Sequence, residues 1–334
     1  MVGVDQAEDP FASASDIKPA PKEFGKVYNG RYHMPLLSGE CGPKSVKDAD
    51  YVSGGIQRMT NLVGAAEDTR ALNVWEQAMA LVGLALSPEL YEELTLMVHQ
   101  ARSDGVNFEL LREYPRLREA LAGTPQDSGE SIVGRAKHAA KANAAAQRGT
   151  NRHTAWEHRG ETGELIGTPA MQEHVVDVER VLAKAGLERV PGLSERIVRN
   201  TEIGAVGKFD DILREISSGR FLMADLKTKA REFFTFVTVD AQLAGYAYSD
   251  WMLATRPARD GGNVASYVPG PRYHVDLTEG VILHAPSDGS PAHLDRADLV
   301  QGWRVAQLAR QIVDVRANGK SAARHVASIW GVQS

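Results

Sequence analysis

The sequence predicts an α/β protein in which a mixed central sheet is flanked by helices and preceded by a helical region. Apolar residues recur at spacings of three and four from about residue 54 to 121, as they do on the buried faces of helices. Two short apolar runs, 206–213 and 220–228, flank the turn sequence Ser217-Ser218-Gly219, which predicts a β-hairpin. Helical and strand-like segments then alternate towards the end of the chain.

The composition limits the class of protein. The 334 residues are enough for one large domain or two ordinary ones, and the formal net charge of -5 argues against a protein that coats nucleic acid. A local basic groove stays compatible with that charge. The single cysteine, Cys41, excludes an internal disulfide framework and fits a cytoplasmic protein. No apolar run approaches ~18 residues and no signal peptide is recognisable, so we expect no membrane association.

Composition and periodicity predict three parts of the chain. Residues 1–25 lack any sustained period and are expected to form a flexible arm. Residues 26–125 are expected to form a helical N-terminal region, in which Ser87-Pro88 begins one helix. Residues 126–334 are expected to form the main domain. Trp75 is expected in the core.

A long, basic, alanine-rich helix is predicted from Ser131 to about Arg159. Lys137, Lys141, Arg148 and Arg152 follow one another at spacings of 4, 7 and 4, so they would form one stripe on it. Two interpretations stay open: a solvated helix face, or a stripe that follows the phosphates of a bound nucleic acid.

The rest of the main domain is predicted as alternating elements. Gly186 is expected to cap the C-terminal end of a helix over 169–185. The other predicted elements are a half-buried strand over 195–204, a helix over 239–253, strands over 273–276 and 281–284, and a helix over 299–315.

The hairpin carries the residues of chemical interest. Folding it about Ser217-Ser218 places Asp210 opposite Asp225, and strand alternation places Asp225 and Lys227 on one face. Opposed carboxylates repel each other, and a divalent cation with oxygen ligands would offset that repulsion. The doublet Asp210-Asp211 leaves a choice of ligand, although alternation favours Asp210. A buried salt bridge between Asp225 and Lys227 is the alternative, but it does not explain the second carboxylate.

Four short motifs in this region resemble those of the PD-(D/E)XK nuclease superfamily, and especially its RecB-type and CRISPR-adaptation-type exonucleases, which phages often carry. In chain order they are Gly149-Thr150-Asn151-Arg152-His153-Thr154-Ala155-Trp156-Glu157, Gly207-Lys208-Phe209-Asp210, Asp225-Leu226-Lys227-Thr228 and Gln242-Leu243-Ala244-Gly245-Tyr246. They look like the family's G-T-x-x-H-x-x-x-E, G-x-x-D, D-x-K-[ST] and Q-x-x-x-Y. The resemblance covers roughly residues 131–255, and its strength lies in the order of the four motifs.

The resemblance implies a restriction-endonuclease-like fold and a role for each matched residue. His153, Asp210, Asp225 and the Leu226 carbonyl would hold the metal. Lys227 would orient or activate the attacking water and offset charge on the phosphate. The residues expected at the DNA are Thr228, Gln242 and Tyr246, together with Lys141, Arg148 and Arg152 of the basic stripe.

The implied function is metal-dependent hydrolysis of DNA from an end, single- or double-stranded, in phage or bacterial recombination or replication. Two carboxylates suit Mg2+, and an imidazole ligand shifts the preference towards Mn2+. The chain lacks the four iron–sulfur cysteines of related CRISPR-type nucleases, and any helicase or recombinase partner would be a separate chain. Two alternatives stay open: an endonuclease on branched or foreign DNA, and a non-catalytic DNA-binding or assembly protein that retains the fold.

Overall fold

The computed structural model describes residues 27–28, 31–32, 34, 55–67, 70–123, 129–142, 144–228, 236–257, 263–286 and 290–329. The chain divides into two compact units. One is helical and spans Asp68–Thr150, and the other combines Asn151–Ser334 with the described part of Met1–Glu67. The sequence had placed the boundary at 125/126 instead. Residues 56–67 pack with the sheets, and residues 129–150 pack with the helices of the first unit.

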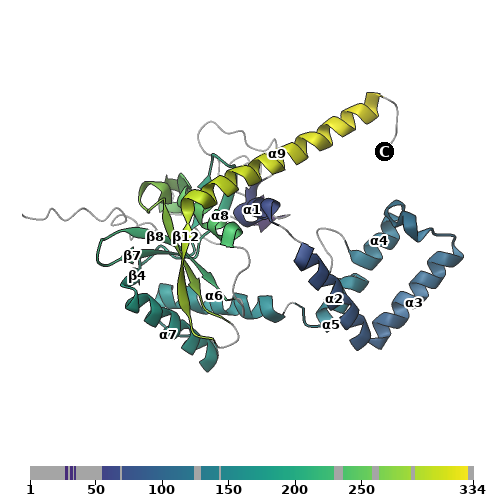
Figure 1. Ribbon diagram of the computed structural model, residues 1–334, viewed down its shortest axis with the longest axis horizontal. Helices are drawn as coiled ribbons and strands as arrows, with labels where there is room; N and C mark the ends of the chain where they lie inside the picture. Colours follow the sequence, from purple (N-terminus) through teal and green to yellow (C-terminus); the bar gives the residue numbers. More distant parts are fainter. Residues whose placement is uncertain are drawn as a thin grey trace, which may run out of the picture. The chain divides into compact units, whose positions relative to one another are not determined.

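The described residues of the first unit form helices and no strands (Figure 1). These helices are α2 (Arg70–Leu86), α3 (Pro88–Ser103), the 3-10 helix η4 (Phe108–Glu113), α4 (Pro115–Ala122), α5 (Ile132–Ala139) and the first part of α6 (Ala144–Thr162). Gly83 brings α2 and α5 together, because a Cβ there would lie 1.7 Å from the Ala136 carbonyl oxygen. Pro88 lies in the first turn of α3, as the sequence predicts.

The second unit contains two mixed sheets, so the predicted α/β class is confirmed. The larger sheet has the order β1-β2-β3-β6-β5-β9-β10, and the smaller has the order β12-β11-β8-β7-β4. The strands of the larger sheet are β1 (Val27–Tyr28), β2 (Arg31–Tyr32), β3 (Ile56–Arg58), β5 (Ile197–Asn200), β6 (Ala205–Lys208), β9 (Trp251–Pro257) and β10 (Asn263–Pro269). Those of the smaller are β4 (Leu187–Arg189), β7 (Asp211–Glu215), β8 (Phe221–Lys227), β11 (Glu279–His284) and β12 (His293–Asp298).

Helices cover both faces of the smaller sheet (Figure 1). On one face, Met223 and Ile282 pack with α1 (Met59–Val63), α8 (Phe236–Ala247) and α9 (Leu299–Ile329). On the other, Ala224 and Leu283 pack with α6 and with α7 (Pro169–Lys184), which Gly186 ends in a left-handed conformation at φ +69°. The centre of the sheet is therefore apolar on both sides, and β8 is buried along almost its whole length.

The hairpin register agrees with the sequence prediction. Strand β7 pairs with β8 in antiparallel fashion, with Asp211 opposite Ala224 and Arg214 opposite Phe221. The same register carried one residue further places Asp210 level with Asp225. Strand β8 also pairs in parallel with β11, so the hairpin lies inside the sheet and not at its edge.

Two predicted elements are split in the structure. The helix expected over 131–159 is broken between α5 and α6, because Lys141 adopts φ +55°, a left-handed conformation that a continuous helix cannot contain. The strand expected over 206–213 is divided at Phe209-Asp210, where the chain leaves the larger sheet at β6 and enters the smaller one at β7.

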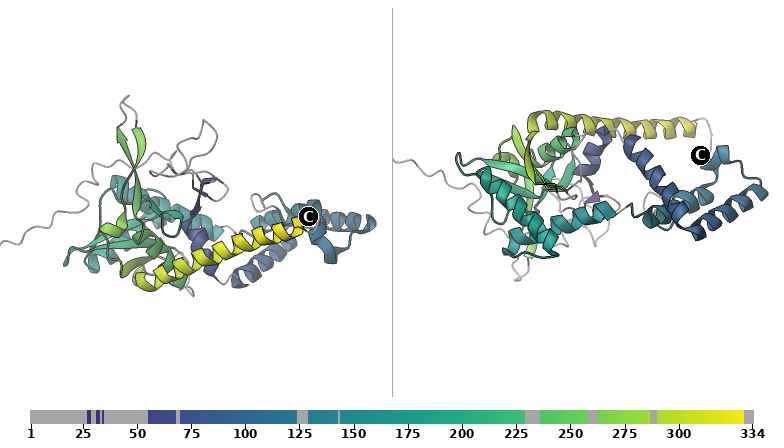
Figure 2. Two further views of the ribbon diagram at one scale, coloured as in Figure 1. Left: turned by 90° about the horizontal axis from the view of Figure 1, so that it is seen from above. Right: turned by 60° about the horizontal axis from the view of Figure 1, so that its bottom comes forward.

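Three further element predictions need correction. The strand over 273–276 is absent, since the 3-10 helix η5 (Pro271–Tyr273) and a turn occupy that stretch. The helix expected over 239–253 ends at Ala247, and β9 begins four residues later. Helix α9 continues past the predicted end at 315 to Ile329 as one long helix (Figure 2). Among the described residues, no helix combines the length and the apolar character needed to cross a bilayer.

Candidate metal centre

The candidate centre is built around the C-terminal end of β8. Asp225 and Lys227 lie two residues apart and project from the same face, and the Lys227 ammonium lies 2.5 Å from the Asp225 carboxylate. The ion pair between them, which the sequence reasoning held as the alternative to a metal site, is therefore present. Burial alone lowers the pKa of Lys227, but the attraction of Asp225 and Asp210 outweighs it, so the pKa is raised and the side chain remains an ammonium at neutral pH.

Asp210 supplies the second carboxylate from the junction between the two sheets. Its Oδ2 accepts a hydrogen bond of 2.7 Å from the Leu226 amide, which brings it beside β8. Burial and the nearby negative charge of Asp225 raise the pKa of Asp210 well above its ordinary value, and Lys227 opposes that shift only in part. The two carboxylates thus repel each other in a poorly solvated environment, and a bound cation would offset that repulsion.

The neighbouring Asp211 has both carboxylate oxygens engaged in hydrogen bonds within the protein. Its fully buried carboxylate accepts hydrogen bonds of 2.5 Å from the Trp156 indole and from the Ser194 hydroxyl, and of 3.0 and 3.1 Å from the Arg189 guanidinium. Arg189 also donates to the Trp156 carbonyl on α6 and stacks over its ring. Every oxygen of Asp211 is engaged on the face opposite Asp210, so Asp210 is the member of the pair available to a ligand.

Helix α6 brings His153 to the carboxylates. Its Nδ1 lies 3.5 Å from Asp210 Oδ2, and the imidazole also hydrogen-bonds to the backbone of Leu226. Burial lowers the pKa of His153, against the opposing effect of Asp225, so the ring is neutral at neutral pH. A neutral imidazole has the lone pair that a metal ligand needs. His153, Asp210 and the Leu226 backbone therefore lie together, and Asp225 lies near enough to shift the pKa of both His153 and Asp210.

Glu195 joins this group and was missed by the sequence reasoning. One ligand atom from each of His153, Glu195 and Asp210 lies within 4.8 Å of the other two. The Glu195 amide donates to the Asp210 carbonyl at 3.0 Å, and its carboxylate pairs with Lys208. Its φ of +56° is unusual for a residue other than glycine and is often found at functional sites. The only sequence signal for Glu195 is that it is a carboxylate at the start of the predicted strand 195–204.

The glutamine of helix α8 is half-buried and links the buried tyrosine of that helix to Asp225. The Gln242 amide donates to Asp225 Oδ1 at 3.2 Å and to the Tyr246 hydroxyl at 3.1 Å. Only 2% of Tyr246 is exposed, and burial followed by the charges of Asp225 and Asp210 raises its pKa well above 10. The expected DNA contact of Tyr246 is not compatible with this burial, whereas the DNA contact expected of Gln242 stays a prediction.

Gly207 explains how Tyr246 fits. A Cβ at this position would lie 2.2 Å from Cε1 of the Tyr246 ring and 3.0 Å from Cβ of Met59. The glycine of the G-x-x-D motif therefore gives the ring room against β6. The glycine of this motif is therefore required for packing, which the sequence alone did not show.

The four basic residues do not lie on one continuous helix as predicted, because the helix is broken between α5 and α6. Lys137 of α5 pairs with Glu76 of α2 at 3.2 Å, and Lys141 lies in the turn between α5 and α6. Arg152 donates to the Pro286 carbonyl at 3.0 Å. Lys141 and Arg148 are exposed, and Arg148 and Arg152 lie four residues apart on one face of α6. Thr228 follows β8 directly and is half-buried.

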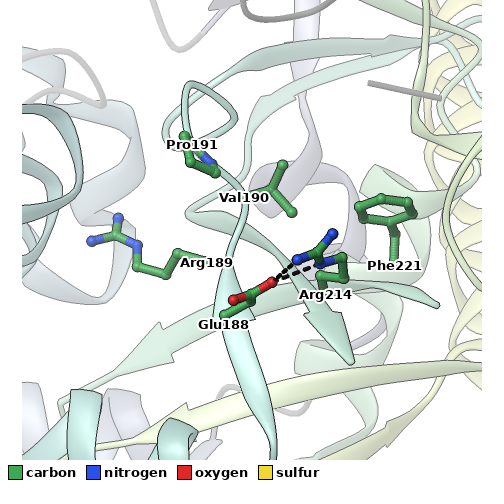
Figure 3. A pocket seen from close by; sticks show the side chains of 6 residues that line it. All are labelled: Glu188, Arg189, Val190, Pro191, Arg214 and Phe221. Carbon is green, nitrogen blue, oxygen red and sulfur yellow. Dashed lines mark hydrogen bonds and ion pairs between the residues drawn. The ribbon is translucent and has the colours of Figure 1, made fainter. Parts of the chain in front are cut away.

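A surface pocket of about 260 Å3 lies beside β4 and β7 of the smaller sheet (Figure 3). It is lined by Glu188, Arg189, Val190, Pro191, Arg214 and Phe221. Glu188 and Arg214 pair with each other in it, while the Arg189 side chain points away from them (Figure 3). None of the residues around Asp225 lines this pocket, so it is separate from the candidate metal centre.

The residues at the centre fit a divalent cation. Carboxylate and carbonyl oxygens are the ligands that Mg2+ prefers, and one imidazole is compatible with Mn2+. The raised pKa of Asp210 supports this fit, because an uncompensated carboxylate pair is unfavourable when both members are ionised. Comparison with models of protein families gives no match for this chain, and comparison with curated proteins gives none either. The function is therefore argued from the geometry and from the motifs.

Proposed function

We propose that the chain is a metal-dependent deoxyribonuclease of the PD-(D/E)XK type, with a restriction-endonuclease-like core, that hydrolyses DNA from an end. The observation that carries the proposal is that Asp210 lies near Asp225 and its partner Lys227, which is protonated, and within 4.8 Å of ligand atoms of His153 and Glu195. Mg2+ or Mn2+ would be held by Asp210, Asp225, His153 and the Leu226 carbonyl, with Glu195 as a further oxygen ligand. When bound, the ion would lower the pKa of a water molecule and stabilise the charge that develops on the phosphate.

The chain's own residues divide the remaining tasks. Lys227 keeps its proton at neutral pH, so it acts as a cation that attracts and orients the phosphate and not as the base. Gln242 holds Oδ1 of Asp225 and Lys227 holds Oδ2, so these two contacts together fix the orientation of the carboxylate. His153 is positioned indirectly: Arg189 and Asp211 hold Trp156, three residues further along α6, against the sheet.

The test is a digestion assay on purified full-length protein. The substrates are end-labelled linear single-stranded and double-stranded DNA and a covalently closed plasmid, each with Mg2+, with Mn2+ or with EDTA. Lys227→Ala is compared with Lys184→Ala, which removes an exposed lysine at the end of α7. We expect metal-dependent loss of linear DNA, abolished by the first substitution and unchanged by the second.

Other outcomes distinguish the alternatives. Cutting of the closed plasmid would identify an endonuclease with the same centre, since an enzyme that needs an end cannot start on a circle. No digestion with either metal, together with retained DNA binding, would support a non-catalytic binding protein. Activity that persists in EDTA or in Lys227→Ala would refute the proposed chemistry.

A further inference from the structure

A second group of metal-ligating side chains lies on the β11–β12 hairpin, and the proposed nuclease chemistry does not use it. His284 is directly opposite His293, and Ile282 is opposite Asp295, in the antiparallel register of the two strands. Residues opposite each other share a face, as do residues two apart on one strand. His284, His293 and Asp295 therefore project from the same side of the smaller sheet.

The distances among the three side chains are those of a metal site. His284 Nδ1 lies 3.0 Å from His293 Nε2, and His293 Nε2 lies 3.4 Å from Asp295 Oδ2. One ligand atom from each of the three residues lies within 4.8 Å of the other two. Two ligands placed about 2.0–2.1 Å from a tetrahedral ion are themselves about 3.3 Å apart. The observed separations are close to that value, so little movement is needed to bind an ion.

The ligand types select the ion. Two imidazoles and one carboxylate suit zinc and other first-row transition metals, whereas Mg2+ and Ca2+ prefer oxygen ligands alone. Three protein ligands leave a fourth tetrahedral position for water. His284 is buried and His293 is 45% exposed, so the group has both a fixed ligand and access from solvent.

The position of the group gives the ion a structural consequence. His284 is the last residue of β11 and His293 the first of β12, so an ion bound to both would join the two strands at the end where residues 285–292 connect them. His284 is also level with Lys227 in the parallel register of β11 and β8. Neighbouring strands lie about 4.8 Å apart, so the group is one strand away from the candidate centre and on the same face.

We propose that His284, His293 and Asp295 form a zinc site that fixes the end of the β11–β12 hairpin beside the candidate centre. The competing account is a simple hydrogen bond between the two imidazoles, one donating and one accepting. That account uses neither the carboxylate nor its 3.4 Å approach to His293. The zinc site does not depend on nuclease activity, so either proposal can fail without the other.

The experiment is calorimetric titration of metal-stripped, full-length protein with Zn2+ in the presence of excess Mg2+. The Mg2+ competes for the oxygen-rich centre around Asp225 and has little affinity for imidazole. We expect one Zn2+ per chain at micromolar or tighter affinity, and a higher midpoint of thermal unfolding when Zn2+ is present. His293→Ala and Asp295→Asn should each weaken binding by at least about tenfold, because even outer partners of metal ligands contribute about 10–100-fold.

Matched variants locate the ion. His99→Ala removes an exposed histidine of α3 and should bind Zn2+ like the wild type, and Asp225→Asn should keep the zinc site as well. His293 and Asp295 are not in the core, so circular dichroism should show both variants folded. No Zn2+ binding by the wild type, or unchanged binding in both variants, would overturn the proposal. Zn2+ binding that is lost in Asp225→Asn and kept in His293→Ala would also overturn it, by assigning the ion to the other centre.

Discussion

The two adjacent aspartates are expected to respond in opposite ways to the same substitution. Asp211→Asn keeps the shape of the side chain but removes a fully buried charge that pairs with Arg189 and accepts from Trp156 and Ser194. The guanidinium would then lie in the interior without its carboxylate. Breaking one side of a buried ion pair typically costs about 3–5 kcal/mol. Burial nevertheless raises the pKa of Asp211 in spite of Arg189, which offsets part of this contribution, so we expect the free energy of unfolding to fall by no more than the lower end of that range.

Asp210→Asn should not show this loss. Burial and the charge of Asp225 raise the pKa of Asp210, so its ionised form is unfavourable in the metal-free protein at neutral pH. The uncharged amide removes that repulsion and can still accept the hydrogen bond from the Leu226 amide through its carbonyl oxygen. We expect equal or greater stability without metal, together with loss of Mn2+ binding, because an amide is a far weaker ligand than a carboxylate.

Two measurements on each variant check this reasoning. Urea unfolding followed by circular dichroism gives the free energy of unfolding, and calorimetric titration with Mn2+ gives the affinity. The expected result is one variant that is destabilised but binds metal, and one that is stable but does not bind. The reasoning is refuted if Asp211→Asn unfolds like the wild type, or if Asp210→Asn loses several kcal/mol in the absence of metal.

Three further predictions concern single residues. Gly207→Ala should lower the free energy of unfolding in urea by about 1–3 kcal/mol, since its methyl group would meet the buried Tyr246 ring at 2.2 Å. The control is Gly319→Ala, on an open part of α9. Equal effects of the two substitutions would contradict the packing argument. Glu195→Gln should weaken Mn2+ binding in calorimetry by roughly tenfold or more, ~1.4 kcal/mol, and an unchanged affinity would exclude it as a ligand. Burial raises the pKa of Asp240 to about 6, so its contribution to stability is present below the unfolded pKa and is lost as pH rises through 6. Asp240→Asn should therefore raise the free energy of unfolding relative to wild type by about 1 kcal/mol near pH 8, after allowance for solvent screening, and not near pH 4; a higher thermal midpoint at pH 8 alone is the readout.

The amphipathic period was informative about which segments are helical but not about which helices stay buried. Trp75 was expected in the core from its spacing with neighbouring apolar residues, yet 46% of it is exposed on α2. Periodicity identifies an apolar face, but it does not say whether another element covers that face. Gly83, by contrast, has a tertiary reason, since only a residue without Cβ lets α5 approach α2 so closely.

The sequence by itself determined the register and content of the central hairpin. A turn at Ser217-Ser218 and a period of two suffice to place Asp210 level with Asp225 and Lys227 on the same face, because strand geometry is local and regular. Asp210, Asp225 and Lys227 could therefore be proposed as one group before the fold was known, whereas His153 was added only by the resemblance to a nuclease family. The α/β class followed from the same alternation of periods.

The tertiary structure alone decided how each of these residues is used. The contacts of Asp211 with Trp156 and Arg189 join segments more than twenty residues apart, and they assign that carboxylate to the scaffold. Glu195 reaches Asp210 only because the chain bends back at a left-handed residue. His284 and His293 meet only because two strands pair. Such contacts depend on long-range packing, which leaves no fixed spacing in the sequence, and this is the physical reason that the local pattern could not reveal them.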